Sequence, residues 1–377
     1  MLLTAVASLL KYAGVQTFYS RNFYMESFYR ILPLLIVIGF AGCKKKEAGI
    51  IVPPPPPAAN TFSNPILSSG PDPWIIKQGT AYYYMHTLGN RIAIWKTNKV
   101  TALNSATAVD VWIAPATGPN SKNVWAPEMH FINNKWYTYY TAGSSADLAT
   151  QRTFVLENSS ADPQAGTWVD KGKIYDAAAD FFAIDGTVFN HNGNNYFLWS
   201  GQSSASDNTQ RIYIARMSDP WTLATPRSLI SSPQFSWESI GAPPAVNEGP
   251  EILKNAAGKV FLIFSASGCW TDDYGLGILS LRDGGDPLVA ADWTKTPTPV
   301  FSKNVAASVY GPGHNSFFKS MDGTEDWILY HANPTTGLGC GNNRSPRIQK
   351  FSWNADGTPN FGTPVSTSTF ITKPSGE

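Results

Sequence analysis

The stretch DPWIIKQGTAYYYMH, residues 72–86, opens on a Pro/Asp corner, reaches an apolar residue four positions later, and ends in an aromatic run after a second turn. The same order recurs in four further stretches, which begin at Pro127, Asp185, Gly249 and Gly313. Successive copies are 55, 58, 64 and 64 residues apart. Supersecondary units repeated at such even spacing indicate a radial or linear repeat architecture.

The segments within and between these copies have the pattern of β-strands. The aromatic and β-branched runs at 82–85, 136–140, 196–199 and 260–264 are short, and most have turn residues close before them. Further strand candidates lie at 91–96, 154–156, 211–216, 277–281 and 347–351, with no convincing amphipathic helix between them. Residues 60–377, shared among five units, leave roughly 60 residues for each four-stranded blade. We therefore predict an all-β fold, a five-bladed β-propeller over residues 60–377.

Three acids stand at equivalent corners of this repeat. Asp72 and Asp185 open two copies, and Glu248 directly precedes a third. In a propeller the first strand of each blade lines the central channel, so these corners should face one another at one mouth. Two carboxyl groups on opposite sides of a pocket can hydrolyse a glycosidic bond, and a third raises the pKa of the acid. The simpler alternative is that each acid only caps a turn.

The overall charge argues against a polyanionic partner. The net charge is +1 and only 15% of residues are charged. The one dense basic cluster is Lys44-Lys45-Lys46, outside the expected globular part. A nucleic-acid-binding surface needs a basic face, so we expect no nucleic-acid partner.

The N-terminal region has the pattern of an export signal rather than of a folded domain. Residues 31–42 form an apolar run too short to span a bilayer. Small residues followed by Cys43 resemble a bacterial lipobox, so we expect lipidation of Cys43 and a signal segment over 1–43; an ordinary signal peptide is the alternative. Met25 is a possible true start. Residues 44–59 are a polar and proline-rich linker, so the expected location is the cell envelope, with membrane contact through the lipid anchor only.

The two remaining cysteines are candidates for a disulfide. Cys269 and Cys340 both lie in Gly-rich loops that follow aromatic runs. Export to an oxidising compartment would let such a pair persist as a disulfide. Two free buried thiols are the alternative.

Six motifs resemble glycoside hydrolase family 43, the five-bladed propeller arabinosidases and xylosidases. They are GPDPW (70–74), WAPEMHF (125–131), IDGTVF (184–189), NEGPEILK (247–254), GPGHNSF (311–317) and SPRIQKF (345–351). The resemblance implies that Asp72 is the general base, that Asp185 orients the acid and tunes its pKa, and that Glu248 is the general acid. It also implies inversion at the anomeric carbon, for which the two carboxyls of Asp72 and Glu248 should lie about 6.5–9.5 Å apart. Glu251 is the rival for the acid.

The resemblance extends to residues that would bind substrate or an ion. It implies that Arg347 reaches a sugar hydroxyl and that His314 points into the channel, where related enzymes hold Ca²⁺ or another ion through water; His314 could instead be structural. Trp74 and Trp125 lie beside corner residues and could pack on sugar rings, or belong to the core. Glu128 is a weaker candidate for an acid, with a structural role as the alternative. Phe182 belongs with the two tryptophans, and Trp270 and Tyr274 could shape the rim of the pocket. No cofactor is expected to be required.

The form of the motifs most resembles the exo-acting α-L-arabinofuranosidases of this family. We therefore expect removal of terminal arabinofuranose from arabinan or arabinoxylan side chains of the plant cell wall, by a monomer. The insertions at 144–180 and 231–247 could close one end of the cleft. The alternatives are endo-α-1,5-arabinanase, β-xylosidase or exo-β-1,3-galactanase activity, since the fold does not set the sugar. A lipid-anchored glycan-binding propeller is the non-enzyme alternative.

Overall fold

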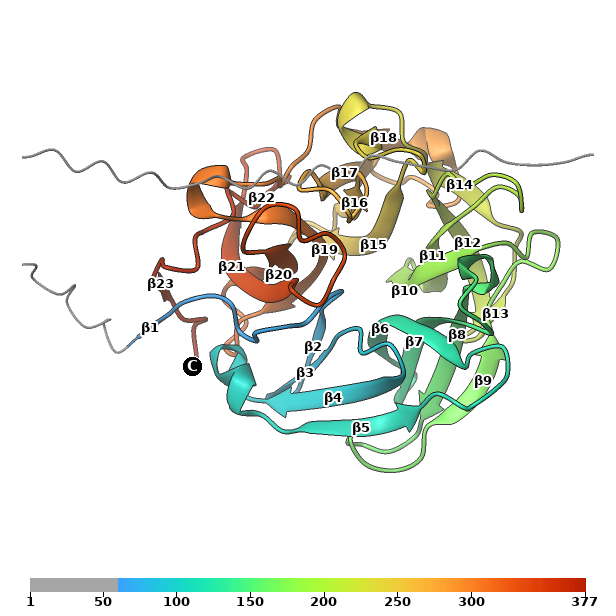
Figure 1. The fold of residues 1–377 in the computed structure, drawn as a ribbon, viewed down its shortest axis with the longest axis horizontal. Helices are drawn as coiled ribbons and strands as arrows, with labels where there is room; N and C mark the ends of the chain where they lie inside the picture. The colour runs from blue at the N-terminus through green and yellow to red at the C-terminus, as the bar shows by residue number, and fades with distance from the viewer. Residues whose placement is uncertain (1–59) are drawn as a thin grey trace, which may run out of the picture. The chain divides into compact units, whose positions relative to one another are not determined.

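Five antiparallel sheets follow one another along the chain and surround a common centre (Figure 1). The computed structural model describes residues 60–377, so the predicted signal segment and linker, with Cys43, lie outside the described residues. Each sheet begins with one of the five repeated stretches and forms one blade, numbered I to V in chain order. The predicted five-bladed β-propeller is confirmed.

The strands follow the sequence pattern closely. Blade I contains β2 (Trp74–Gln78), β3 (Ala81–Met85), β4 (Arg91–Thr97) and β5 (Ala108–Ile113). Blade II contains β6 (Lys122–Ile132), β7 (Lys135–Gly143), β8 (Arg152–Asn158) and β9 (Val169–Lys173). Blade III contains β10 (Ala183–His191), β11 (Asn194–Gly201), β12 (Arg211–Asp219), β13 (Thr222–Leu223) and β14 (Ser228–Ser231). Blade IV contains β15 (Asn247–Lys254), β16 (Val260–Ala266), β17 (Gly275–Leu281) and β18 (Trp293–Lys295), and blade V contains β19 (Tyr310–Lys319), β20 (Asp326–Asn333), β21 (Ser345–Trp353) and β22 (Pro359–Asn360).

Helical structure in the described part of the chain is limited to short 3₁₀ turns. They are η1 (Val100–Ser105), η2 (Leu148–Thr150), η3 (Ser236–Ser239), η4 (Ala290–Asp292) and η5 (Val305–Ala307). No helix long and apolar enough to cross a membrane is found among residues 60–377.

The core consists of five hydrophobic clusters, one between each pair of neighbouring blades. Side chains alternate between the two faces of a strand, so each blade contributes to two clusters. In β3, Tyr83 and Met85 pack toward blade II, whereas Tyr82 and Tyr84 pack toward blade V. This explains why the central strands are almost continuously apolar, since both of their faces are buried.

The starting corner of each blade has an unusual backbone. A residue with positive φ stands at all five corners: Asp72 (55°), Ala126 (42°), Asp185 (55°), Gly249 (53°) and His314 (48°). In β6, β10, β15 and β19 the corner coincides with a shift in strand register. Bulges of this kind redirect side chains and are frequent beside active sites.

The first described residues join blade V to blade I. β1 (Thr61–Phe62) pairs with β23 (Ile371–Thr372). The segment then runs along β21, where Asn64 bonds both the N–H and the C=O of Ile348 at 2.9 Å. The N–H of Gly70 donates to the C=O of Arg344 at 3.0 Å, two residues before Asp72. The position of Asp72 is therefore tied to blade V as well as to blade I.

Candidate active site

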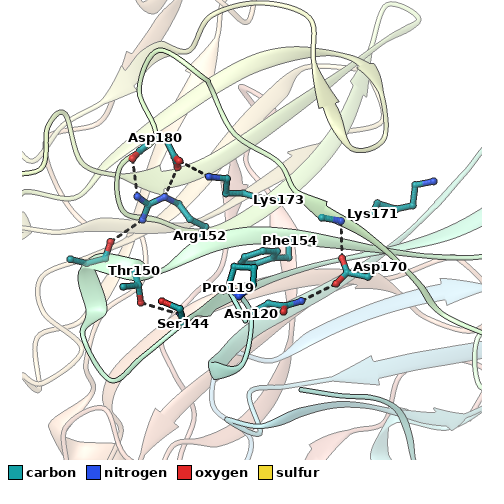
Figure 2. Close-up of a pocket in the computed structure, with 12 residues that line it drawn as sticks. Pro119, Asn120, Ser144, Thr150, Arg152, Phe154, Asp170, Lys171, Lys173 and Asp180 are labelled. Atoms are coloured by element: carbon teal, nitrogen blue, oxygen red, sulfur yellow. Dashed lines mark hydrogen bonds and ion pairs between the residues drawn. The ribbon is translucent and has the colours of Figure 1, made fainter. Parts of the chain in front are cut away.

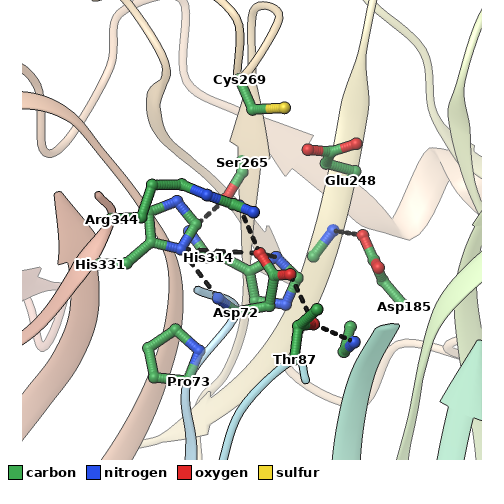
Figure 3. Close-up of polar contacts among 12 residues, drawn as sticks. Asp72, Pro73, Thr87, Asp185, Glu248, Ser265, Cys269, His314, His331 and Arg344 are labelled. Atoms are coloured by element: carbon green, nitrogen blue, oxygen red, sulfur yellow. Dashed lines mark hydrogen bonds and ion pairs between the residues drawn. The ribbon is translucent and has the colours of Figure 1, made fainter. Parts of the chain in front are cut away.

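Asp72 is held as an ionised carboxylate by a set of short contacts (Figure 3). Arg344 Nη1 donates to Oδ1 at 2.7 Å, and Thr87 Oγ1 donates to Oδ2 at 2.7 Å. Burial raises the pKa of this carboxyl, but the Arg344 guanidinium, the two neighbouring histidines and the Thr87 hydroxyl together lower it well below its usual range. Its side chain keeps 12% of its surface exposed, enough to meet a small ligand.

Glu248 is perturbed in the opposite direction. It precedes Gly249 at the corner of blade IV, and Tyr274 Oη donates a hydrogen bond of 2.9 Å to its Oε1. Burial raises the pKa of Glu248 to about 7; the Tyr274 hydrogen bond lowers it and the Asp72 charge raises it. Near neutral pH this carboxyl can therefore carry a proton that it is able to donate.

Asp185 is held by two backbone hydrogen bonds and senses the charges of both other acids. Its N–H donates to Thr141 Oγ1 at 3.1 Å, and its Oδ2 accepts from the N–H of Gly249 at 3.0 Å. Burial raises the pKa of Asp185 well above its ordinary value, followed by the charges of Glu248 and Asp72. The structure thus brings all three predicted acids to one mouth of the channel.

Two histidines connect these groups. His331 Nδ1 accepts the Asp72 N–H at 3.1 Å, and the ring of His331 stacks on that of Tyr274 with centroids 5.7 Å apart. Burial lowers the pKa of His331 well below its ordinary value, so the ring is neutral, as an acceptor must be. His314 stacks on His331 at 5.9 Å and places Nδ1 3.5 Å from Asp72 Oδ1. His331 therefore bridges the residue that contacts Glu248 and the backbone of Asp72.

The remaining residues predicted to bind sugar are placed differently. Trp74 is 9% exposed, packs between blades I and II, and donates from Nε1 to the C=O of Met129 at 3.0 Å. Trp125, partly exposed, pairs with Thr141 across β6 and β7. Arg347 is fully buried, with Nη2 3.5 Å from the C=O of Ala332, so it would have to move to meet a sugar. Their contacts with substrate stay predictions.

The arginine beside the base is Arg344, which the motif pattern did not single out. His331, Thr87 and Tyr274 complete the set of side chains that touch the acids. Arg344 lies in a loop, Thr87 follows β3, Tyr274 precedes β17, and His331 lies within β20. None stands at a repeated corner, so the repeat itself contains no signal for them. The sequence predicts Tyr274 only at the rim of the pocket, whereas the structure places it in contact with the acid.

A second polar group lies deeper, on the strands that line the channel. Glu128 (β6), Glu251 (β15) and Asn315 (β19) are 3%, 5% and 2% exposed. Glu128 Oε2, Glu251 Oε1 and both amide atoms of Asn315 have no hydrogen-bond partner. Burial, then the charge of Glu128, raises the pKa of Glu251 well above its ordinary value. Within residues 60–377 no group of three or more His, Cys, Asp or Glu side chains is arranged to hold a metal.

A large surface hollow lies away from the acids. It measures about 920 Å³ and lies on blade II, where Figure 2 shows Arg152 and Lys173 both directed at Asp180. Asn120 Nδ2 donates to Asp170 Oδ2 at 2.9 Å on its other side. The polar groups of this hollow largely satisfy one another, whereas the mouth with Asp72 and Glu248 contains the perturbed acids. We assign the chemistry to the mouth.

The family follows from the sequence as a whole. Residues 62–359 match the model of "Glycosyl hydrolases family 43". The chain belongs to family 43. An extracellular exo-α-(1→5)-L-arabinofuranosidase of Streptomyces avermitilis is 41% identical over 314 residues, which are 81% of this chain and 64% of that protein. The corresponding protein of Streptomyces chartreusis is 37% identical over 72% of this chain and 82% of its own length.

Solved structures agree with this family 43 assignment. The α-L-arabinofuranosidase of Lactobacillus brevis superimposes with a TM-score of 0.77 at 33% identity, covering 82% of this chain and 98% of that one. This family 43 chain spans 64% of the length of its Streptomyces avermitilis relative.

Cys269 and Cys340 are joined in a disulfide, with Cα atoms 5.1 Å apart. This bond links the loop between β16 and β17 to the loop between β20 and β21. The first loop ends in Tyr274, and the second ends in Arg344. The disulfide therefore joins the two loops whose side chains contact Glu248 and Asp72 in this family 43 site.

Proposed function

We propose that this protein is an inverting exo-α-L-arabinofuranosidase that removes terminal arabinofuranosyl units from arabinan or arabinoxylan side chains. The family membership and the two Streptomyces relatives support the substrate class. The observation that carries the chemistry is the opposite perturbation of two carboxyls at one mouth. The pKa of Asp72 is lowered far below its usual range, while burial raises that of Glu248 to about 7.

In the proposed reaction, Asp72 accepts a proton from a water molecule as that water attacks the anomeric carbon. Glu248 donates its proton to the glycosidic oxygen, so the bond to the leaving sugar breaks with both charges balanced. Asp185 acts as a positioning residue: its Oδ2 accepts the N–H of Gly249, next to Glu248, and so fixes the backbone that carries the acid. Arg344 and Thr87 keep Asp72 ionised and oriented.

The test uses p-nitrophenyl α-L-arabinofuranoside and linear arabinan. We expect release of free arabinose, first as the β-anomer by NMR because the reaction inverts. Glu248→Gln should abolish activity on arabinan, and Asp72→Asn should abolish it on both substrates. Surface variant Lys373→Ala is the control. Retention of the α-anomer, or full activity in Glu248→Gln, would contradict the assignment; cleavage of xylosides or galactan instead would move the substrate to those alternatives.

The reaction uses only carboxyls and water, so we propose that it requires no cofactor. The buried oxygens of Glu128, Glu251 and Asn315, of which Glu128 Oε2 lies 3.4 Å from His130 Nε2, nevertheless fit a hard cation such as Ca²⁺, and the Glu128 charge also acts on His314. These three side chains would supply oxygen ligands to the ion. The charge of the ion would neutralise the buried carboxylates. Chelator treatment should then lower the unfolding temperature; an unchanged value would argue against the ion.

We further propose export of the protein and anchoring through lipidated Cys43. The extracellular Streptomyces relatives support export. The anchor rests on the sequence before Cys43 alone. Labelling with a radioactive fatty acid in a bacterial host should mark the unsubstituted protein and not Cys43→Ser. We keep a monomer and a plant cell-wall polysaccharide as the expected assembly and partner.

A further inference from the structure

Trp270 is an exposed aromatic side chain on the blade that carries Glu248. It lies in the loop between β16 and β17, and 43% of its surface is accessible. A tryptophan combines a large flat apolar ring with a polar N–H at its edge, a combination that is common at binding surfaces.

The indole is held in one orientation by its surroundings. Its Nε1–H donates to the C=O of Gly241 at 3.1 Å. A Cβ at Gly268 would lie 2.2 Å from the ring, and a Cβ at Gly241 would lie 2.7 Å from Nε1. The ring therefore rests directly on glycine backbone, where no other residue would leave room for it. Its remaining surface is a rigid apolar face that is open to a ligand.

The loop of Trp270 is fastened to both reacting carboxyls. Its neighbour Cys269 is bonded to Cys340, whose loop ends in Arg344 on Asp72. At the other end of the same loop, Tyr274 donates to Glu248. Figure 3 shows Cys269 on the same side of the site as Ser265 and Glu248. Trp270 thus lies in the loop whose last residue, Tyr274, contacts the acid, and it packs beside Gly339 in the loop that leads to Arg344.

The position of the general acid determines which part of the substrate lies on its side of the site. A general acid must contact the glycosidic oxygen, so the leaving sugar extends past Glu248 and not past Asp72. A flat aromatic face suits the apolar C–H face of a sugar ring, and aromatic walls with a few polar groups are typical of such sites. Resting on the function proposed above, we propose that Trp270 binds the neutral furanose that forms the leaving group.

The test compares a leaving group that has a sugar ring with one that has none. The substrates are α-1,5-arabinobiose and α-L-arabinofuranosyl fluoride. In Trp270→Ala we expect kcat/KM for arabinobiose to fall about tenfold or more, mainly through KM, with the fluoride unchanged within about twofold. Trp270→Phe, which keeps a flat ring, should recover most of the loss. Phe370→Ala removes another exposed aromatic, 54% accessible, and should affect neither substrate.

Equal losses on both substrates in Trp270→Ala, or no loss on either, would overturn this inference and leave the proposed function standing. An unsubstituted protein that cleaves neither substrate would overturn both. If Trp270→Ala fails to fold, the Glu248→Gln protein can be titrated with arabinobiose and its tryptophan fluorescence followed. The change should be largely lost in Glu248→Gln/Trp270→Phe; an identical change in both proteins would count against Trp270.

Discussion

At the scale of single residues, Asp72 and Glu248 differ because their neighbours differ. Asp72 has a guanidinium and two imidazoles close to its oxygens, whereas Glu248 has one phenol and a like charge. Both acids are deeply placed, so burial alone would raise both pKa values. At Asp72, Arg344, the two histidines and the Thr87 hydroxyl together outweigh burial, whereas at Glu248 the Tyr274 hydrogen bond and the Arg344 charge do not. The different sets of neighbours thus separate a base from an acid in the same mouth.

The first prediction concerns the pH dependence of the unsubstituted protein. Glu248 has to be protonated, so kcat/KM should fall as pH rises above about 7, the pKa of this group. Asp72 has to be ionised. An ordinary aspartate has a pKa of about 3.9, but the pKa of Asp72 is lowered, so activity should persist below pH 4. A profile of kcat/KM against pH measures both limbs. A basic limb near pH 5 would contradict the assignment of Glu248.

The second prediction concerns Tyr274→Phe. The Tyr274 hydrogen bond lowers the pKa of Glu248, so its removal should raise that pKa and move the basic limb up by roughly one pH unit. Phenylalanine keeps the stacking on His331, which limits other effects. Tyr175→Phe, on an exposed tyrosine, serves as control. An unmoved basic limb would show that the hydroxyl does not act on Glu248.

At the scale of elements, strands and acids could be predicted from the sequence, but the groups around the acids could not. Asp72, Asp185 and Glu248 occupy repeated corners, and the fold converts equal positions in the repeat into neighbours around one axis. Arg344 comes from the loop between β20 and β21, outside the repeated corner. The burial of Arg347 between strands, three residues later, depends on which face of β21 it occupies, and the motif does not determine that.

The third prediction concerns the link between the two rim loops. The double variant Cys269→Ser/Cys340→Ser removes a disulfide that spans 71 residues of sequence, which should lower the free energy of unfolding by roughly 2–4 kcal/mol. It should also lower activity below the unfolding temperature, because the loops of Tyr274 and Arg344 are no longer joined. Thermal unfolding and kcat/KM measure the two effects. Cys43→Ser is the control, and an unchanged unfolding temperature would count against the bond.

At the scale of the whole molecule, closing the ring of blades is the step that completes the active site. Blades I and V are far apart in sequence, yet Asp72 comes from blade I while Arg344, His331 and His314 come from blade V or its loops. The contacts that join these blades are therefore also contacts that assemble the base. Segment 60–70 supplies several of them, through the backbone N–H groups of Ile66 and Gly70 and through the side chain of Asn64, all of which bond to the backbone of residues 344–348.

The last prediction tests this closure at Asn64. Its amide bonds both backbone groups of Ile348 and is 3% exposed, so Asn64→Ala leaves a buried N–H and C=O without partners. Unfolding in urea should show that the free energy of unfolding falls by about 2–4 kcal/mol for the two lost bonds, against less than about 0.5 kcal/mol for exposed Ser63→Ala. Asn64→Asp keeps the acceptor but places a buried carboxylate oxygen against the C=O of Ile348, so its loss should be at least as large as that of Asn64→Ala near neutral pH. Because the same segment leads to Asp72, the loss should extend to activity, with the acid limb moving to higher pH as Arg344 and Asp72 separate. Equal stability in Asn64→Ala and Ser63→Ala would mean that the ring is closed by its apolar clusters alone.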